Sequence, residues 1–366
     1  MKISQEILRK RLQKIQDVIA EKEIDAVMLR TLSSFIYFTG LKWLRPALLI
    51  PAEGEPIAFI ARGEEEGFTK RTYIKNIVTF IDGGDLMAKV SGTIRREKYK
   101  VVGLEFSLER DAYILFYEMF KRLNPRVKVI DVSQIIAKMK MEKDDYELSY
   151  IRKAGEIASK AMKKALSTIE PGMAETEIAT ELYSTLYKMG CEKPHVYINV
   201  GPDPRVHTEP FRDIVVKKGV FVTIIIGADY NRYYANMSRT TYIGKLEGRA
   251  EKAVKCMNKA YKLALELTKP EVKFIDVMKK LDEVYAKYEL LNNRLLGYVH
   301  GVGLQIEEPP ITTIVPQHRQ MKVKTRMVIA FIHAPIMMQG LGQVKREDTF
   351  IVKENGELEN ITKTII

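Results

Sequence analysis

The chain has 366 residues, 46% of them apolar, and is long enough to form two domains that each bury a core. It contains no stretch of about 20 uncharged apolar residues, so no membrane span is expected. The charged N-terminal segment lacks the apolar centre of a signal peptide, and the two cysteines, Cys191 and Cys256, do not form a CxxC pair. These features predict a cytoplasmic protein.

The net charge of +12 raises the question of a nucleic-acid partner. Lysine and arginine are spread through every segment, however, usually with glutamate or aspartate close by. The densest clusters, at 95–98 and 138–140, are short and belong to no recognised nucleic-acid module. We interpret the charge mainly as solvated helix faces, so it gives only weak support for binding nucleic acid.

Residues 1–135 alternate helical and strand patterns. A helix is predicted near 4–22, where apolar residues recur at helical spacing. Short apolar runs typical of strands follow at 26–29, 47–50, 57–60, 77–81, 101–104 and 127–130. Helical stretches separating several of these runs lie near 64–72, 85–96 and 108–122. The pattern predicts an α/β domain with a mixed sheet.

The charged stretch 136–145 is expected to be a linker, and the order of elements changes beyond it. Residues 146–366 begin with two long helices followed by strands, and this order then repeats. The predicted helices are near 145–168, 174–189, 248–268 and 273–287, and the predicted strands that follow each pair are near 220–227 and 327–333. Each helix pair is interrupted at a proline, Pro171 or Pro270. Two such half-domains indicate an internal duplication that closes around a shared cleft.

Seven short motifs occur in order along the chain, and together they resemble the prolidase, aminopeptidase P and creatinase family. They are Ser34–Gly40, Glu147–Ala154, Pro171–Ile178, Gly201–His207, Gly219–Thr240, His300–Pro309 and Gly342–Thr349. The resemblance implies a creatinase-like α/β domain over 1–135 and a pita-bread domain with an internal pseudo-twofold duplication over 146–366. It also implies a homodimer.

Active metallopeptidases of that family hold two divalent ions, such as Mn²⁺ or Co²⁺, with two aspartates, one histidine and two glutamates. Oxygen donors suit such ions, and two ions can share the attacking hydroxide. The resemblance places these five ligands, in chain order, at Ile225, Asn236, His300, Ile332 and Glu347. Isoleucine cannot bind a metal and asparagine offers one neutral oxygen, so three ligands are expected to be missing. We therefore expect no bound metal cofactor.

Two residues near these positions are not expected to restore the set. Asp229 lies four residues after Ile225 and is expected to point elsewhere. His333 follows Ile332, and strand alternation is expected to turn it away from the face that Ile332 occupies, as a structural histidine. The sequence leaves open whether a rebuilt metal site involving His333 exists.

The resemblance also implies two histidines near the substrate. The first is retained as His207, which is a candidate general base or an ordinary loop histidine. The second position holds Glu307, a candidate catalytic carboxylate, and Glu308 follows it. The two glutamates can bind a cationic ligand or can be solvent-facing charges without a role.

The two retained ligand positions need partners of another kind if no metal is bound. Glu347 is expected to be buried beside the metal position, and a buried carboxylate requires a partner, for which His300 and Arg239 are the candidates. His300 itself is expected to have a structural role behind a glycine-rich turn.

Three functions remain open. The favoured one is a pseudoenzyme whose cleft binds a peptide or a small molecule. The second is a metal-independent C–N hydrolase of the creatinase kind, in which His207 acts as the base with Glu307 or Glu347 as its partner. The third is residual Xaa-Pro dipeptidase or aminopeptidase activity with a single, weakly held metal ion. Because peptidase chemistry in this family depends on its metal ligands, the third function is the least expected.

Overall fold

The computed structural model describes residues 3–41, 47–106 and 113–363. The chain forms two compact units, Met1–Lys140 and Met141–Ile366. The boundary between them lies inside the stretch 136–145, where a linker was predicted. That stretch is not an extended linker, however, because helix α6 (Ser133–Met141) covers its first half.

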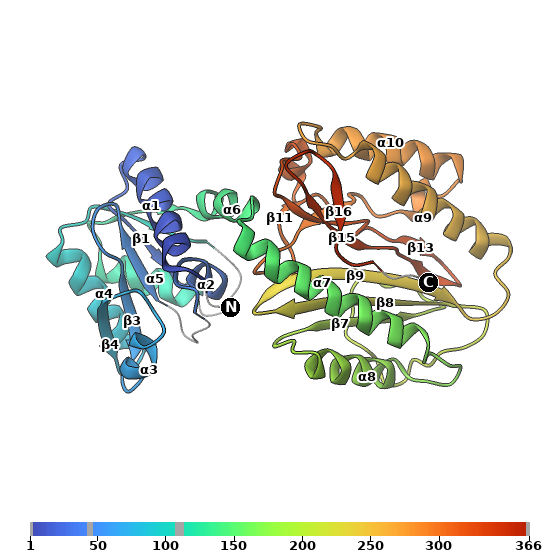
Figure 1. Cartoon of the computed structure of the whole chain (residues 1–366), viewed down its shortest axis with the longest axis horizontal. Coiled ribbons are helices and arrows are strands. Elements are labelled where there is room, and N and C mark those ends of the chain that lie inside the picture. The colour runs from blue at the N-terminus through green and yellow to red at the C-terminus, as the bar shows by residue number, and fades with distance from the viewer. Residues whose placement is uncertain (1–2, 42–46, 107–112, 364–366) are drawn as a thin grey trace. The chain divides into compact units, whose positions relative to one another are not determined.

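The first unit is an α/β domain built on a mixed sheet (Figure 1). Its strands are β1 (Ala26–Leu29), β2 (Leu48–Pro51), β3 (Ile57–Ala61), β4 (Asn76–Phe80), β5 (Val101–Leu104) and β6 (Lys128–Asp131). They lie in the order β4-β3-β2-β1-β5-β6, with β1 antiparallel to β2 and parallel to β5. Its other helices are α1 (Gln5–Glu21), α2 (Leu32–Thr39), α3 (Glu65–Thr69), α4 (Gly83–Arg96) and α5 (Tyr113–Leu123). The mixed sheet predicted from the sequence is confirmed.

Three helices of this unit differ from the sequence prediction. Seven of the eight residues of α2 are buried, so it has no polar face that would reveal a helical period. The predicted helix over 108–122 is found as α5, but its residues 108–112 lie outside the described residues. The lysines that suggested a linker, Lys138 and Lys140, lie in the last turn of α6, where basic residues complement the helix C-terminus.

The second unit contains four long helices in two pairs. They are α7 (Asp145–Leu166), α8 (Glu175–Lys188), α9 (Gly248–Leu267) and α10 (Phe274–Lys287), with short 3₁₀ turns η1 (Leu291–Asn293) and η2 (Pro316–Gln320). α7 begins with a capping box between Asp144 and Glu147. Both pairs break at the predicted prolines, which cannot continue a helix. Within the described residues, no helix is long and apolar enough to cross a membrane.

Two main sheets lie between these helices (Figure 1). The first is antiparallel and consists of β7 (His195–Val200), β8 (Phe221–Tyr230) and β9 (Tyr233–Tyr242). The second has the order β11-β10-β12-β15-β16, with β10 (Val299–Gly301), β11 (Glu308–Ile311), β12 (Val328–Phe331), β15 (Asp348–Val352) and β16 (Leu358–Asn360). A two-stranded ribbon pairs β13 (Ile336–Met338) with β14 (Gly342–Val344). One apolar core joins α7 and α8 to the first sheet, and another joins α9 and α10 to the second.

The two sheets meet where β9 passes the start of β15. The backbone amides of Ser238 and Glu347 donate to each other's carbonyl oxygens, at 3.0 and 3.2 Å. Two residues away, the hydroxyl of Thr349 accepts from the amide of Asn236 and donates to its carbonyl, both at 2.8 Å. This junction brings side chains of the two sheets to one place, which is where the candidate site lies.

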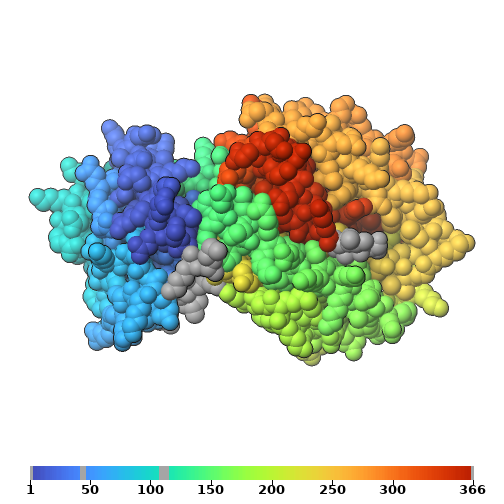
Figure 2. Space-filling model, in the orientation of Figure 1, coloured from blue at the N-terminus to red at the C-terminus, as the bar shows by residue number. Residues whose placement is uncertain are grey.

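The C-terminal segment packs against α7 on the surface of the second unit. Figure 2 shows the red C-terminal end of the chain beside the green of α7. The guanidinium of Arg152 donates to both carboxylate oxygens of Glu359, at 2.8 Å each. Gly155 allows this approach, because a Cβ on it would lie only 2.3 Å from the carbonyl oxygen of Ile361.

Candidate functional site

The first half of the candidate site is the β8–β9 hairpin. Ile225 lies directly opposite Ser238, and Gly227 lies opposite Asn236. Because side chains alternate along a strand, Ile225, Ser238 and Asn236 face the same side of the sheet. All three are at most 4% exposed. At these positions the hairpin therefore presents a hydrocarbon, a hydroxyl and an amide.

Asp229 lies on this same face of β8. The expectation that it points to a different side of the strand than Ile225 is therefore wrong. It is four residues from Ile225, and a period of two returns it to the same side. Its Oδ1 accepts from the amides of Glu192 at 3.1 Å and Lys193 at 2.8 Å, and burial raises its pKa. The carboxylate thus binds the backbone amides of the loop before β7.

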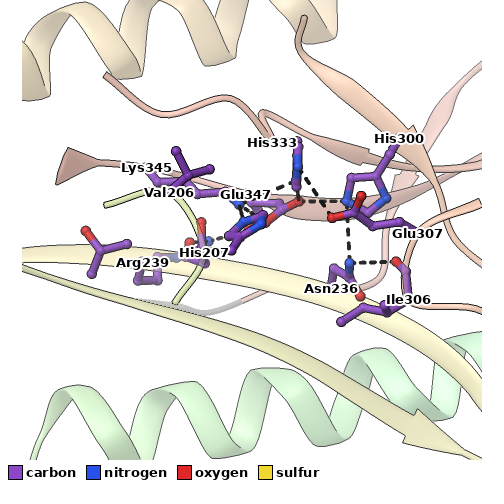
Figure 3. Close-up of polar contacts among 12 residues, drawn as sticks. Val206, His207, Asn236, Arg239, His300, Ile306, Glu307, His333, Lys345 and Glu347 are labelled. Carbon is purple, nitrogen blue, oxygen red and sulfur yellow. Dashed lines mark hydrogen bonds and ion pairs between the residues drawn. The ribbon is translucent and has the colours of Figure 1, made fainter. Parts of the chain in front are cut away.

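The second half of the site is a buried cluster around Glu347 (Figure 3). Oε1 of Glu347 lies 3.1 Å from Nε2 of His300 and 3.2 Å from Nδ1 of His333. Its Oε2 lies 3.0 Å from Nζ of Lys345, in an ion pair that lacks hydrogen-bond geometry. These four residues are at most 7% exposed. The predicted burial of Glu347 and its pairing with His300 are confirmed.

Arg239 is not the partner of Glu347 that the sequence suggested. Its guanidinium ion-pairs with the carboxylate of Asp348 at 2.8 Å and donates to the main-chain carbonyl of Glu347 at 2.9 Å. Glu347 and Asp348 are neighbours on a strand, so their side chains point to opposite faces and only one of them can meet Arg239.

Ile332 and His333 point in different directions, as predicted, but His333 and not Ile332 lies in the site, so the expectation of a merely structural histidine is wrong. β12 ends at Phe331, so strand alternation does not extend to Ile332 and His333. Ile332 is fully buried in the apolar core that includes Phe331 and residues of α9 and α10. Burying this hydrocarbon in the core is favourable, and His333 takes the place beside Glu347 instead. His300 likewise has two polar partners here and is more than a packing residue behind a turn.

His207 reaches the same cluster from the loop between β7 and β8. Its Nε2 lies 3.1 Å from Nζ of Lys345, and its ring stacks on Tyr197 with 5.4 Å between centroids. Burial and the ammonium of Lys345 lower the pKa of His207 to about 2. His207 is therefore neutral at pH 7, and its Nε2 accepts the proton of Lys345.

The loop that carries His207 is anchored by Glu175, a fully buried residue at the start of α8. Its carboxylate accepts from the amides of Val200 at 2.7 Å and Phe211 at 3.0 Å, on either side of His207. It also pairs with Arg205. These contacts fix the loop at three points and so position His207.

Glu307 and Glu308 have different environments. The half-buried carboxylate of Glu307 lies 3.5 Å from Nε2 of His333. Glu308 is buried in an ion pair with Lys143 and is neither a free cation site nor a solvent-facing charge. Since His207 and Glu307 are only partly buried while His300 and Glu347 are fully buried, the cluster is accessible from the side of His207 and Glu307.

Asn236 turns its amide nitrogen into the cluster. Nδ2 donates to the carbonyl of Ile306 at 2.9 Å and lies 3.4 Å from Nε2 of His300. Oδ1 of Asn236 and the hydroxyl of Ser238 are buried and have no hydrogen-bond partner among the described residues. The oxygen of Asn236 therefore does not face His300.

The charges of the cluster shift the ionisation of its members. Burial alone would raise the pKa of Glu347, but Lys345, His300 and His333 hold it well below its usual range. Burial disfavours the charged form of His300, yet the hydrogen bond to Glu347 and the charge of Glu307 raise its pKa. Burial and Lys345 lower the pKa of His333 to about 4. Glu347 is consequently the fixed negative charge of the site.

Sequence reasoning missed the roles of Lys345 and Glu175, and it placed His333 outside the site. A signal for Lys345 was present, because Lys345 precedes Glu347 by two residues and a period of two puts them on one face. No comparable signal existed for His333, whose direction depends on where β12 ends.

The fold and this cluster define a pita-bread domain that follows a creatinase-like α/β domain. The chain belongs to the metallopeptidase family M24, because the sequence model of that family matches residues 149–354. Residues 11–141 match the creatinase/prolidase N-terminal domain. Both matches confirm the resemblance seen in the sequence motifs.

Individual relatives match over almost the whole chain. The Xaa-Pro dipeptidase of Pyrococcus furiosus is 26% identical over 98% of this chain and 99% of its own. The crystal structure of the prolidase from Pyrococcus horikoshii OT3 has a TM-score of 0.87 at 25% identity and covers 97% of this chain and 99% of its own. A creatinase from a Bacillus species is 22% identical over 98% of this chain and 91% of its own.

Proposed function

We propose that this chain does not act as a two-metal Xaa-Pro peptidase and that its site binds a peptide or small-molecule ligand. The observation that carries the proposal is Ile225, a buried hydrocarbon on the face of β8 where the resemblance places the first metal-binding carboxylate. A branched hydrocarbon offers no ligand atom and excludes the water that a second ion would carry.

The remaining residues do not fit two ions either. Asn236 directs its nitrogen, not its oxygen, towards His300. Ile332 lies in the apolar core. Glu347 is then the single carboxylate at the five positions, and two divalent cations at such a site would repel each other with little negative charge to offset them.

Lys345 supports this interpretation. Its ammonium lies 3.0 Å from Glu347 and 3.1 Å from His207, where it balances the buried carboxylate without any metal ion. A buried carboxylate otherwise requires such a partner. The charge of the site is thus balanced by the chain itself.

A creatinase-like hydrolase is the other candidate, because a creatinase is among the relatives. His207 would have to act as its base. The structure does not favour that role, because Nε2 of His207 accepts from Lys345 and its pKa is lowered to about 2, which makes it a weak base. Ligand binding on the accessible side of His207 and Glu307 is therefore the better-supported function.

The test is hydrolysis of Xaa-Pro dipeptides by the purified chain in the presence and absence of Mn²⁺ or Co²⁺. The expected result is no turnover above that of the Glu347→Gln variant, which serves as the matched control for contaminating peptidases. Metal-dependent hydrolysis that is absent from Glu347→Gln and is abolished by a chelator would overturn the proposal.

A further inference from the structure

Three nitrogen and oxygen donors converge in the buried cluster in a way that the proposed function does not use. They are Nε2 of His300, Nδ1 of His333 and a carboxylate oxygen of Glu347, and all lie within 4.8 Å of one another. We infer that His300, His333 and Glu347 form a binding site for a single divalent transition-metal ion of the zinc class. Two imidazoles and one carboxylate form one of the ligand sets that zinc takes in proteins.

The spacing of the donors fits one ion. Zinc binds nitrogen and oxygen at about 2.0 Å, and in tetrahedral geometry this separates the ligand atoms by about 3.3 Å. Oε1 of Glu347 lies 3.1 Å from Nε2 of His300 and 3.2 Å from Nδ1 of His333. Small adjustments of the three side chains would thus bring them into a zinc coordination shell.

The hydrogen bonding of His300 points the same way. Its Nδ1 lies 2.9 Å from the carbonyl oxygen of Gly301, which can only accept, so Nδ1 carries the proton. Nε2 therefore faces Oε1 of Glu347 across a position that either a second proton or a metal ion can occupy. The amide nitrogen of Asn236, which donates to the carbonyl of Ile306, also lies 3.4 Å from Nε2.

Each of the three ligands also has an outer partner, as metal-binding side chains usually do. His300 has the carbonyl of Gly301, and Nε2 of His333 lies 3.5 Å from the carboxylate of Glu307. Oε2 of Glu347 pairs with Lys345, which leaves Oε1 for the ion. Such partners fix the direction of the ligand atoms. Nδ1 of His333 also lies 3.5 Å from Nζ of Lys345, so an ion at the common point requires this ammonium to stay with Oε2 of Glu347 and Nε2 of His207.

Three protein ligands leave one position of a tetrahedral ion for a water molecule or for an oxygen of a ligand. The accessible side of the cluster is lined by His207 and Glu307. The inference therefore goes beyond the proposed function, because it gives the bound ligand a metal ion to which a carboxylate or carbonyl oxygen can bind.

The experiment is zinc analysis of the full chain after treatment with a chelator, incubation with excess Zn²⁺ and gel filtration. We expect one zinc per chain, and loss of more than about 100-fold in affinity in His333→Ala, since even outer partners are worth about 10–100-fold. The matched control is His195→Ala. It removes a histidine that lies outside the cluster, so this variant should retain the zinc. Binding no zinc, or retaining it equally in both variants as an adventitious surface ion, would overturn the inference.

A second measurement uses only the wild-type chain, so it still tests the site if the His333→Ala variant does not fold. The wild-type chain loaded with Co²⁺ should show the visible absorption of a four- or five-coordinate ion, whereas a six-coordinate aqueous-type spectrum would contradict the site. The zinc-binding test and the peptidase test have independent outcomes. Mn²⁺-dependent Xaa-Pro hydrolysis overturns the proposed function, and absence of zinc overturns only the metal site.

Discussion

The two halves of the site face each other across the junction of the sheets and differ in chemistry. The β8–β9 half presents Ile225, Ser238 and Asn236, none of them charged. The opposite half gathers Glu347, Lys345 and three histidines. Each half is supported by its own sheet and core, so the two halves can differ in chemistry within one fold.

The strongest test of this comparison is to introduce a carboxylate into the neutral half. Ile225→Asp loses a buried hydrocarbon and leaves an unpaired buried charge, so we expect a loss of about 5 kcal/mol or more in the free energy of unfolding. Urea denaturation measures it. The control Ile225→Val should cost only about 0.5–1.5 kcal/mol. If the aspartate variant is as stable as the valine variant, position 225 can hold a charge and the neutral half does not exclude carboxylates.

The next largest effect is expected in the charged half. Glu347→Gln removes the negative partner of Lys345 and leaves a buried ammonium unpaired, which typically costs about 3–5 kcal/mol. Chemical denaturation without added metal should show this loss. Glu307→Gln, at a carboxylate that is 25% exposed, should change stability by less than about 1 kcal/mol. Equal effects for the two variants would mean that the charged half is not organised around Glu347.

The junction between the halves gives a smaller effect. Thr349→Val removes the hydroxyl that binds both the amide and the carbonyl of Asn236, and a buried amide left unsatisfied costs about 1–3 kcal/mol. Thr349→Ser keeps the hydroxyl and should retain most of the stability. Thermal or urea unfolding of the pair tests this, and a serine variant as unstable as the valine variant would point to lost packing instead.

The smallest effect concerns Asp229 and depends on pH. Its pKa is raised by burial, so the folded state holds the proton more tightly than the unfolded state, and Asp229 lowers stability as the pH rises above its ordinary value of about 4. Asp229→Asn lacks this charge. The stability of the variant relative to the wild type should therefore increase as the pH rises above about 4. A difference independent of pH would show that Asp229 is not desolvated in the fold.

The sequence was sufficient for the fold and for part of the site. The motifs correctly indicated both domains, and the prolines correctly marked the breaks between the paired helices. Burial of Glu347 and its contact with His300 also followed from the motifs. The prolines and the motifs are local patterns, which a sequence records directly. The contact between Glu347 and His300 spans 47 positions and was expected only because the resemblance places both residues at metal-ligand positions.

The remaining features depend on where elements end and on contacts between distant segments. His333 lies beside Glu347 because β12 ends at Phe331 and Ile332 enters the core, and no periodicity reports that end. The anchoring of the His207 loop by Glu175 joins residues 25 to 36 positions apart. The burial of Glu308 against Lys143 spans 165 positions. Such contacts are set by tertiary packing and not by local propensity.

The most direct test of the account is the number of divalent ions that the purified chain retains after incubation with excess Zn²⁺, Mn²⁺ or Co²⁺ and removal of free metal. The account predicts one zinc per chain, held by the charged half, and no second ion, because Ile225 and Asn236 supply no carboxylate. Two ions per chain, accompanied by hydrolysis of Xaa-Pro dipeptides, would contradict it.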